Sequence, residues 1–309
     1  MIFDLDIVYV NYFSLDKLLN SLESFFTCLK KDGFRINIFI IDNSYGETSE
    51  EEDYKDLLNL YKKYSEINFK LNIIKNLTNI GYGSGCNLGA SLGKSKKILI
   101  LNCDTVFIND GNFTNSLINF LNKVNDKVAI CAPMILNEKK QRENSYFSFD
   151  PFFLLIKPIN HLFKLNKFLS FLNFKFIRNY LEKMAYLNRK KNRPVFVDWV
   201  SGCSMLIQRD FFESIKGFDP MFFLYFEDID ICRMAREKSK KVLYYPEFKI
   251  IHIGNYESSK KRGILNSIFS NKTTRYHISS WAKYLFKWRK DFLNYKNSKY
   301  TIFENTNNE

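Results

Sequence analysis

Strand-like and helix-like runs alternate over the first 107 residues, and this alternation constrains the fold more than any other feature of the chain. Apolar strands are predicted at residues 5–10, 36–41, 68–76 and 97–107. Helices are predicted at residues 14–31 and about 51–65, and after a glycine-rich loop at 79–89. This order predicts an α/β fold with a parallel, doubly wound sheet that is covered by helices.

Polar residues follow the predicted strands. They are Asn11, Asp42, Asn79 and Asp104. Ligands bind at the carboxyl ends of strands in such sheets, so four polar ends in succession suggest one site. Taken alone, Asp42-Asn43-Ser44 favours a helix cap or an Asx turn, and a carboxylate that accepts a hydrogen bond from a ligand is the alternative.

The segment NIGYGSGCNLG, residues 79–89, carries four glycines. Its spacing approaches the dinucleotide fingerprint, but it follows the third strand and not the first, which argues against a Rossmann cofactor site. The segment instead predicts a loop whose backbone approaches a ligand closely, with Asn79 and Asn87 as polar contacts.

Asp104 leaves an apolar strand in LILNCDTVF and suits a hard divalent cation that takes its other ligands from water and phosphate. A strand-terminating turn is the alternative. His252 ends another predicted strand, FKIIHIGN, where it is either a metal ligand or a satisfied structural histidine.

Three acids, Glu227, Asp228 and Asp230, stand beside an aromatic run in FFLYFEDIDICRMA. Acids in the first turn of a helix complement its dipole, which accounts for one or two of them. A partly desolvated carboxylate beside aromatic walls is also a plausible general base.

The formal net charge of +13 is unevenly distributed. Residues 151–195 carry ten basic side chains and one acidic, and residues 255–309 carry eleven and four, while the rest is nearly neutral. The six cysteines show no metal-binding spacing and are expected to be reduced, mostly buried thiols of a cytosolic protein. The N-terminus predicts a strand, without a signal peptide, and no apolar run reaches the length that spans a bilayer.

Seven motifs in order, VYVNY, IIDNS, NIGYGSGCNLG, LILNCDTVF, VSGCSMLIQR, GFDPMFFLYFEDIDIC and IIHIGN, resemble the inverting glycosyltransferases of family 2. The resemblance covers about residues 5–254 and is greatest to rhamnosyltransferase-like members that build polysaccharide and O-antigen chains. It implies the GT-A fold, a nucleotide-diphosphosugar donor such as a dTDP- or UDP-sugar, and Mg²⁺ or Mn²⁺.

The resemblance also implies residue roles. Asp42 would contact the nucleotide base with Asn11, Tyr12 and Asn43 beside it, and Asn79, Gly83, Asn87 and Asn102 would line the donor site. Asp104 matches the last acid of the family's D-x-D motif, which is Asn102-Cys103-Asp104 here, so the single carboxylate predicts a weak metal site, with His252 near the metal and diphosphate. Asp228 would be the catalytic base with Glu227 secondary, and Trp199, Gly202 and Asp230 would lie on the acceptor side.

The expected organisation is a GT-A domain over residues 1–254 and a basic helical extension over 255–309. Within the domain we expect a nucleotide-binding half (1–110), a basic amphipathic insertion (151–195) and an acceptor and catalytic half (196–254). The mixture of apolar and basic residues in the insertion is consistent with two roles, packing of one face on the sheet or reversible binding to anionic lipid. The resemblance then implies a lipid-linked or glycan acceptor at the cytoplasmic face of the cell membrane.

Two other functions compete with sugar transfer. A metal-dependent nucleotidyltransferase would normally have a glycine-rich loop after the first strand, and VNYFSLDK has no glycine. A basic non-enzymatic protein that binds nucleic acid or membrane is the third, but the basic blocks lie outside the motif-bearing segments and no nucleic-acid module appears, so we expect no nucleic-acid partner.

Overall fold

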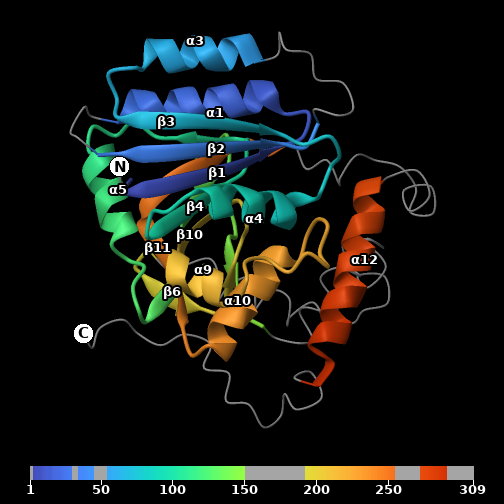
Figure 1. Cartoon of the computed structure of the whole chain (residues 1–309). Coiled ribbons are helices and arrows are strands. Elements are labelled where there is room, and N and C mark those ends of the chain that lie inside the picture. Colours follow the sequence, from blue (N-terminus) through green and yellow to red (C-terminus); the bar gives the residue numbers. More distant parts are fainter. Residues whose placement is uncertain (1–2, 30–33, 45–53, 150–191, 255–271, 291–309) are drawn as a thin grey trace, which may run out of the picture.

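The computed structural model describes residues 3–29, 34–44, 54–149, 192–254 and 272–290 (Figure 1). It confirms the alternation of strands and helices in the first half of the chain. In order, the elements of that half are β1 (Leu5–Asn11), α1 (Leu15–Cys28), β2 (Ile36–Asp42), α3 (Lys55–Lys63), β3 (Phe69–Lys75), α4 (Tyr82–Leu92), β4 (Lys97–Leu101), β5 (Thr105–Phe107), α5 (Phe113–Leu121) and β6 (Val128–Leu136).

The second half completes the sheet and adds three helices to the described part of the chain. Its elements are β7 (Tyr146–Phe147), β8 (Val195–Val197), β9 (Trp199–Val200), β10 (Ser204–Gln208), α9 (Arg209–Ser214), α10 (Glu227–Glu237), β11 (Lys241–His252) and α12 (Lys272–Lys287). Helix α10 begins at Glu227, so the three acids do lie in the first turn of a helix, as the sequence indicates.

The main sheet has nine strands within the described residues, in the order β3-β2-β1-β4-β10-β6-β11-β5, with β8 on β11. Strands β3, β2, β1 and β4 are parallel, but β10 runs antiparallel to both of its neighbours. The sheet is thus mixed and mostly parallel, and the carboxyl ends of β1, β2 and β4 meet at one edge.

The run at residues 97–107, predicted as one strand, is two strands. A turn in which the Thr105 amide donates to the Asn102 carbonyl (3.3 Å) separates them. Strand β4 pairs with β1 and β10, whereas β5 pairs antiparallel with β11, which places Thr105 opposite His252. The break matters because it places Asp104 on a turn beside the end of β11.

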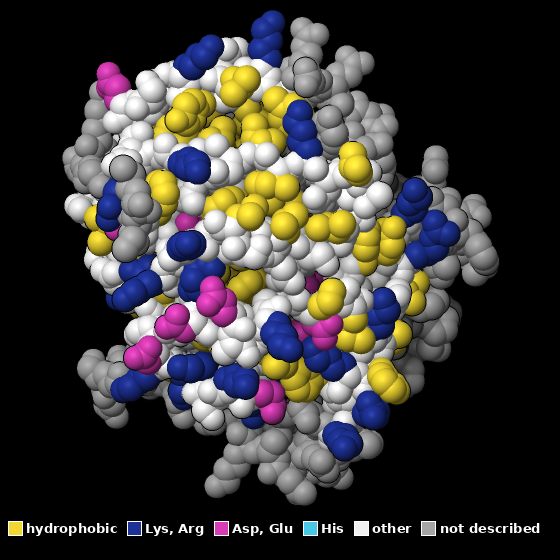
Figure 2. Space-filling view, in the orientation of Figure 1, with side chains coloured by type: hydrophobic (Ala, Val, Ile, Leu, Met, Phe, Trp, Pro, Cys, Tyr) yellow, Lys and Arg dark blue, Asp and Glu magenta, His cyan; other side chains and the backbone are white. Residues whose placement is uncertain are grey.

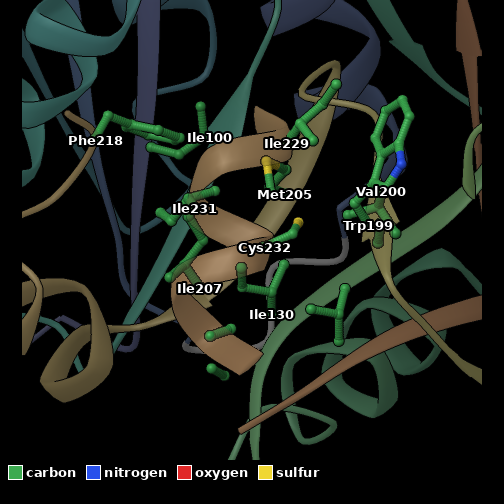
Figure 3. Close-up of a cluster of buried hydrophobic side chains, with 14 of the residues drawn as sticks. Ile100, Ile130, Trp199, Val200, Met205, Ile207, Phe218, Ile229, Ile231 and Cys232 are labelled. Atoms are coloured by element: carbon green, nitrogen blue, oxygen red, sulfur yellow. The ribbon is translucent and has the colours of Figure 1, made fainter. Parts of the chain in front are cut away.

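Helices cover both faces of the sheet (Figure 1). Alternate residues of β1 enter different cores: Leu5, Ile7 and Tyr9 pack with α1, α3 and α5, and Val8 packs with α4, α9 and α10. Figure 3 shows the second core, where Ile229, Ile231 and Cys232 of α10 lie against Ile130, Met205 and Ile207 of the sheet. This packing fixes the helix that carries the acid cluster.

The described part of the C-terminal block contains helix α12, as predicted. Four aromatic side chains lie near the end of α12 or just after it. Tyr284 is fully buried, and Trp281 and Trp288 pack on the core, while Phe286 is 66% exposed. Figure 2 shows Lys and Arg side chains on the part of this face that α12 occupies. Among these four side chains, only Phe286 is largely exposed.

The predicted insertion at residues 151–195 lies outside the described residues except for its last four positions. Among the described helices, none is both long and apolar enough to cross a bilayer.

Candidate active site

The ends of β1 and β2 form a buried polar cluster around Asp42. Its Oδ1 accepts hydrogen bonds from Asn11 Nδ2 (3.1 Å) and the Ser44 amide (2.9 Å), and its Oδ2 accepts from the Tyr54 hydroxyl. The Ser44 bond is the Asx-turn geometry that the sequence favoured for this motif. Contact with a nucleotide base stays a prediction for Asp42, which is 2% exposed. Tyr12 beside it is 42% exposed.

Asn43 connects this cluster to the glycine-rich segment. Its side chain donates to the Gly81 carbonyl (3.2 Å) and accepts from Asn76 (2.8 Å), while Asn79 Oδ1 accepts from the Gly81 amide (2.9 Å). Gly81 has a φ of +87°, and a Cβ there would lie 2.6 Å from the Phe223 carbonyl oxygen. A glycine is therefore required where the loop meets the segment before α10.

The remaining glycines of that segment do not lie in a loop, which corrects the expectation. Helix α4 begins at Tyr82 and contains Gly83, Gly85 and Gly89. A Cβ at Gly83 would lie 3.1 Å from Phe218 Cβ, and one at Gly89 would lie 2.5 Å from Val8 Cγ1. These glycines allow the helix to pack closely, and the expected donor contact of Gly83 stays a prediction.

Asn87 holds a turn rather than presenting a free amide. Its Nδ2 donates to the Phe218 carbonyl and its Oδ1 accepts from the Phe218 amide, both at 2.8 Å. Gly217, which precedes Phe218, has a φ of +76°, and a Cβ there would collide with Asn87 Oδ1. Asn87 thus stabilises the turn at Gly217 and Phe218, in the segment that leads to α10.

Tyr82, which the sequence did not single out, connects the donor side of the site to the catalytic side. Its hydroxyl donates to Asn102 Oδ1 (2.9 Å) and lies 3.3 Å from the Gly202 carbonyl oxygen. The Asn102 amide donates to the Cys203 carbonyl (3.0 Å). The sequence signal that could have identified Tyr82 is its position between Gly81 and Gly83, because an aromatic side chain can fill the space that two glycines leave open.

Asp104 and His252 meet as the strand pairing requires. His252 Nε2 lies 3.2 Å from Asp104 Oδ1, and His252 Nδ1 lies 4.0 Å from Glu143 Oε2. The pair is close but poorly aligned, since Asp104 Oδ1 has no hydrogen-bond donor of good geometry among the described residues. Burial lowers the pKa of His252, but the Asp104 carboxylate and the Cys203 thiol outweigh burial and raise it to about 11.

This pair fits a cation that takes most of its ligands from elsewhere. In the described ranges, no three His, Cys, Asp or Glu side chains form a cluster that could hold a metal ion. Mg²⁺ commonly binds through one or two carboxylates and completes its shell with water and substrate phosphate. Asp104, with a buried oxygen that lacks an aligned donor, matches that pattern.

Asp228 lies at the start of α10 and is held at both oxygens. Its Oδ2 accepts from the Gly202 amide and its Oδ1 from the Ile229 amide, both at 2.9 Å. A Cβ at Gly202 would lie 3.0 Å from Asp228 Cβ, so a side chain there would push the carboxylate away. Asp228 is only partly buried.

Glu227 is in a different environment from its neighbour. It is 5% exposed, and its Oε2 has no hydrogen-bond partner among the described residues. Burial, and then the charge of Asp228, raise the pKa of Glu227 well above its usual value, which favours the protonated form more than at an exposed glutamate. The two neighbouring acids thus differ in burial and in hydrogen bonding, and the role of catalytic base stays a prediction for Asp228.

Two residues that the sequence assigned to the acceptor side are buried in other contacts. Trp199 stacks on Phe147 with ring centroids 4.2 Å apart, and its Nε1 donates to the Ser148 carbonyl. Asp230 is 2% exposed and accepts from Lys287 Nζ and Trp288 Nε1, each at 2.8 Å. Their contacts are those of structural residues, and they give no support to direct contact with an acceptor.

Comparison with known proteins identifies the relatives of this chain. The family model described as "Glycosyltransferase like family 2" matches residues 74–285. The chain is 34% identical over 93 residues to rhamnosyltransferase WbbL of Escherichia coli (strain K12), which is 30% of this chain and 32% of that protein. It is 33% identical over 60 residues to the N-acetylglucosaminyl-diphospho-decaprenol L-rhamnosyltransferase of Mycobacterium tuberculosis, 19% of each chain. The matches thus span a third or less of these relatives.

Solved structures agree on the fold. A structure of GalNAc-T7 with UDP, GalNAc and Mn²⁺ superposes with a TM-score of 0.58 at 15% identity, over 95% of this chain and 50% of that one. TarS of S. aureus gives 0.50 at 11% identity, over 96% and 44%. At these identities the likeness shows the fold alone, and the family match is what favours sugar transfer over the two competing functions.

Proposed function

Because the chain belongs to the glycosyltransferase-like family 2, we propose that it is an inverting enzyme that moves L-rhamnose from a nucleotide-diphosphosugar to a hydroxyl group. The donor is a dTDP- or UDP-sugar, and the acceptor is a glycan or lipid-linked glycan of cell-surface polysaccharide synthesis. The choice of sugar is supported by the two relatives, both of which are rhamnosyltransferases. The choice of acceptor is supported by the name of the mycobacterial relative, which specifies a sugar on a diphospho-decaprenol.

The chemistry requires one base and one leaving group. The acceptor oxygen forms a bond to the anomeric carbon while the bond from that carbon to the diphosphate oxygen breaks, and the electron pair leaves with the nucleoside diphosphate. The hydroxyl proton passes to Asp228, whose position is set by the Gly202 and Ile229 amides. Attack on the face opposite the leaving group inverts the anomeric configuration.

Asp104 and His252 are the residues that would hold Mg²⁺ or Mn²⁺. The bound metal would neutralise negative charge on the departing diphosphate. A metal ligand must be neutral or anionic, so binding through His252 requires that the imidazole lose the proton that Asp104 stabilises. With one carboxylate, we expect weak binding and activity that depends on added metal.

The single observation that carries the proposal is the match of residues 74–285 to the glycosyltransferase family, and the hydrogen bond from the Gly202 amide to Asp228 supports the choice of base. A panel of dTDP-rhamnose and UDP-sugars tests it, with lipid-diphosphate-linked N-acetylglucosamine as the first acceptor and no acceptor in a parallel set. We expect nucleoside diphosphate release that requires Mg²⁺ or Mn²⁺ and that stops with EDTA. Full activity in EDTA, together with a silent Asp104→Ala variant, would contradict the metal proposal.

We further propose that the enzyme acts at the cytoplasmic face of the cell membrane. The support is the sequence of residues 151–195, where ten basic side chains stand among many Phe and Leu residues. This segment lies outside the described residues, so the proposal rests on sequence, and its test is given in the Discussion.

A further inference from the structure

The segment from Asp219 to Phe226, which we call the base loop, leads directly into the helix that carries Asp228. Its last two residues, Tyr225 and Phe226, have φ values of +68° and +70°. Two consecutive bulky residues in the left-handed region are uncommon, because the Cβ crowds the backbone there. The loop therefore needs contacts from outside itself to keep this conformation.

Helix α12 supplies those contacts at both ends of the base loop. Lys287 Nζ lies 2.8 Å from Asp219 Oδ2, at the start of the loop, and 2.8 Å from Asp230 Oδ2, in the first turn of α10. Trp288 Nε1 donates to the other oxygen of Asp230 at 2.8 Å. The Lys287 ammonium group thus connects Asp219, which precedes Asp228 in the chain, with Asp230, which follows it.

The same helix also contacts the middle of the base loop. Ser280 Oγ donates to the Leu224 carbonyl, and Lys283 Nζ to the Met221 carbonyl, each at 2.8 Å. The His277 ring lies 5.0 Å from the Tyr225 ring and 5.5 Å from the Phe226 ring, so it faces both left-handed residues. Figure 1 shows α12 beside α10, although the two are separated by β11 in the chain.

The base loop reaches the donor side of the site as well. The Phe223 carbonyl accepts from the Tyr82 amide at 2.9 Å, and the Phe223 ring lies 4.4 Å from the Tyr276 ring of α12. Any movement of α12 would therefore be passed to Tyr82 and to Asp228 together.

We propose that Lys287 is a positioning residue for the sugar-transfer reaction, because it holds the base loop in the conformation that places the Asp228 carboxylate against Gly202. This inference rests on the proposed function, since it takes Asp228 as the base. Lys287 itself touches neither substrate nor metal in this account, and it acts through the loop. A displacement of a catalytic group by about 1 Å can cost about 10²-fold in rate.

The test compares Lys287→Met, which removes the charge but keeps most of the stem, with Lys287→Arg and with Lys290→Met, a change at an exposed side chain three residues after the end of α12. We expect Lys287→Met to lower kcat about 10-fold or more, with binding of dTDP or UDP, measured by calorimetry, within about twofold of wild type. Lys287→Arg should recover most of kcat, and Lys290→Met should be unchanged.

The decisive measurement repeats Lys287→Met in an Asp228→Asn background. If Lys287 acts through Asp228, its removal adds less than about twofold to the loss already present. An equal fold-loss in both backgrounds, or an unchanged kcat in the single variant, would overturn the inference. A silent Asp228→Asn variant would instead refute the proposed base, so the two failures are distinguishable.

Discussion

At the scale of single residues, the three acids of FEDID occupy three different environments. Glu227 is buried, and its pKa is raised well above the usual value, mainly by burial. Asp228 is partly exposed and held by two amides, and Asp230 is bound to Lys287 and Trp288. The sequence predicted that a helix begins here and that one acid is a base. It could not assign Asp230 to α12, because that partner lies 57 residues away in the chain.

Gly202 gives a prediction at this scale. In Gly202→Ala the new Cβ would lie 3.0 Å from Asp228 Cβ, so the carboxylate must shift by a few tenths of an ångström. We expect kcat to fall by about 10-fold, with little change in nucleotide binding. Gly111→Ala is the control, since a Cβ there meets nothing within 4 Å. The φ of Gly111 is +76°, a backbone strain that Gly202 does not share, so the control is the more demanding change for the backbone. Loss of activity in the control alone would contradict this view of Gly202.

At the scale of elements, the hydrophobic pattern predicted most of the strands and helices in the first hundred residues but not which strands are neighbours. The antiparallel insertion of β10 between β4 and β6 follows from tertiary pairing, which no local pattern encodes. The glycines of α4 led to the incorrect prediction of a loop for a similar reason. They allow contact with Val8 and Phe218, residues far from them in sequence, and this gain outweighs their poor helix propensity.

One buried ion pair ties β1 to α9. Arg209 Nη2 lies 2.7 Å from Asp6 Oδ2, Asp6 is fully buried, and the Ser95 amide and hydroxyl complete the carboxylate's hydrogen bonds. Removal of one partner leaves an uncompensated buried charge. We therefore expect Arg209→Met to lower the free energy of unfolding by about 3–5 kcal/mol in urea titrations.

Glu213→Gln is the matched control for that experiment. Glu213 pairs with the same arginine, but its side chain is 62% exposed, so the change should be within about 0.5 kcal/mol. Equal stability of Arg209→Met and wild type would show that the pair does not hold these elements together.

At the scale of the whole molecule, the charge distribution predicts lipid binding through residues 151–195. We expect salt-sensitive sedimentation with anionic vesicles that is lost when Lys164, Lys167, Lys175 and Arg178 are changed to Glu, with transfer to a soluble acceptor retained. The control changes Lys62, Lys94, Lys139 and Lys216 to Glu, four exposed side chains that give the same change in net charge. Equal loss in both variants, or no binding by wild type at low salt, would contradict this role.

The central claim is that Asp228 takes the proton of the acceptor hydroxyl, and one measurement tests it most directly. It is the kcat of Asp228→Asn beside that of Asp210→Asn, an exposed acid in the first turn of α9, with donor binding followed by calorimetry. The account predicts that Asp228→Asn loses about 10²-fold or more in kcat while its donor affinity stays within about twofold, and that Asp210→Asn is unchanged. Near-normal turnover by Asp228→Asn would contradict it.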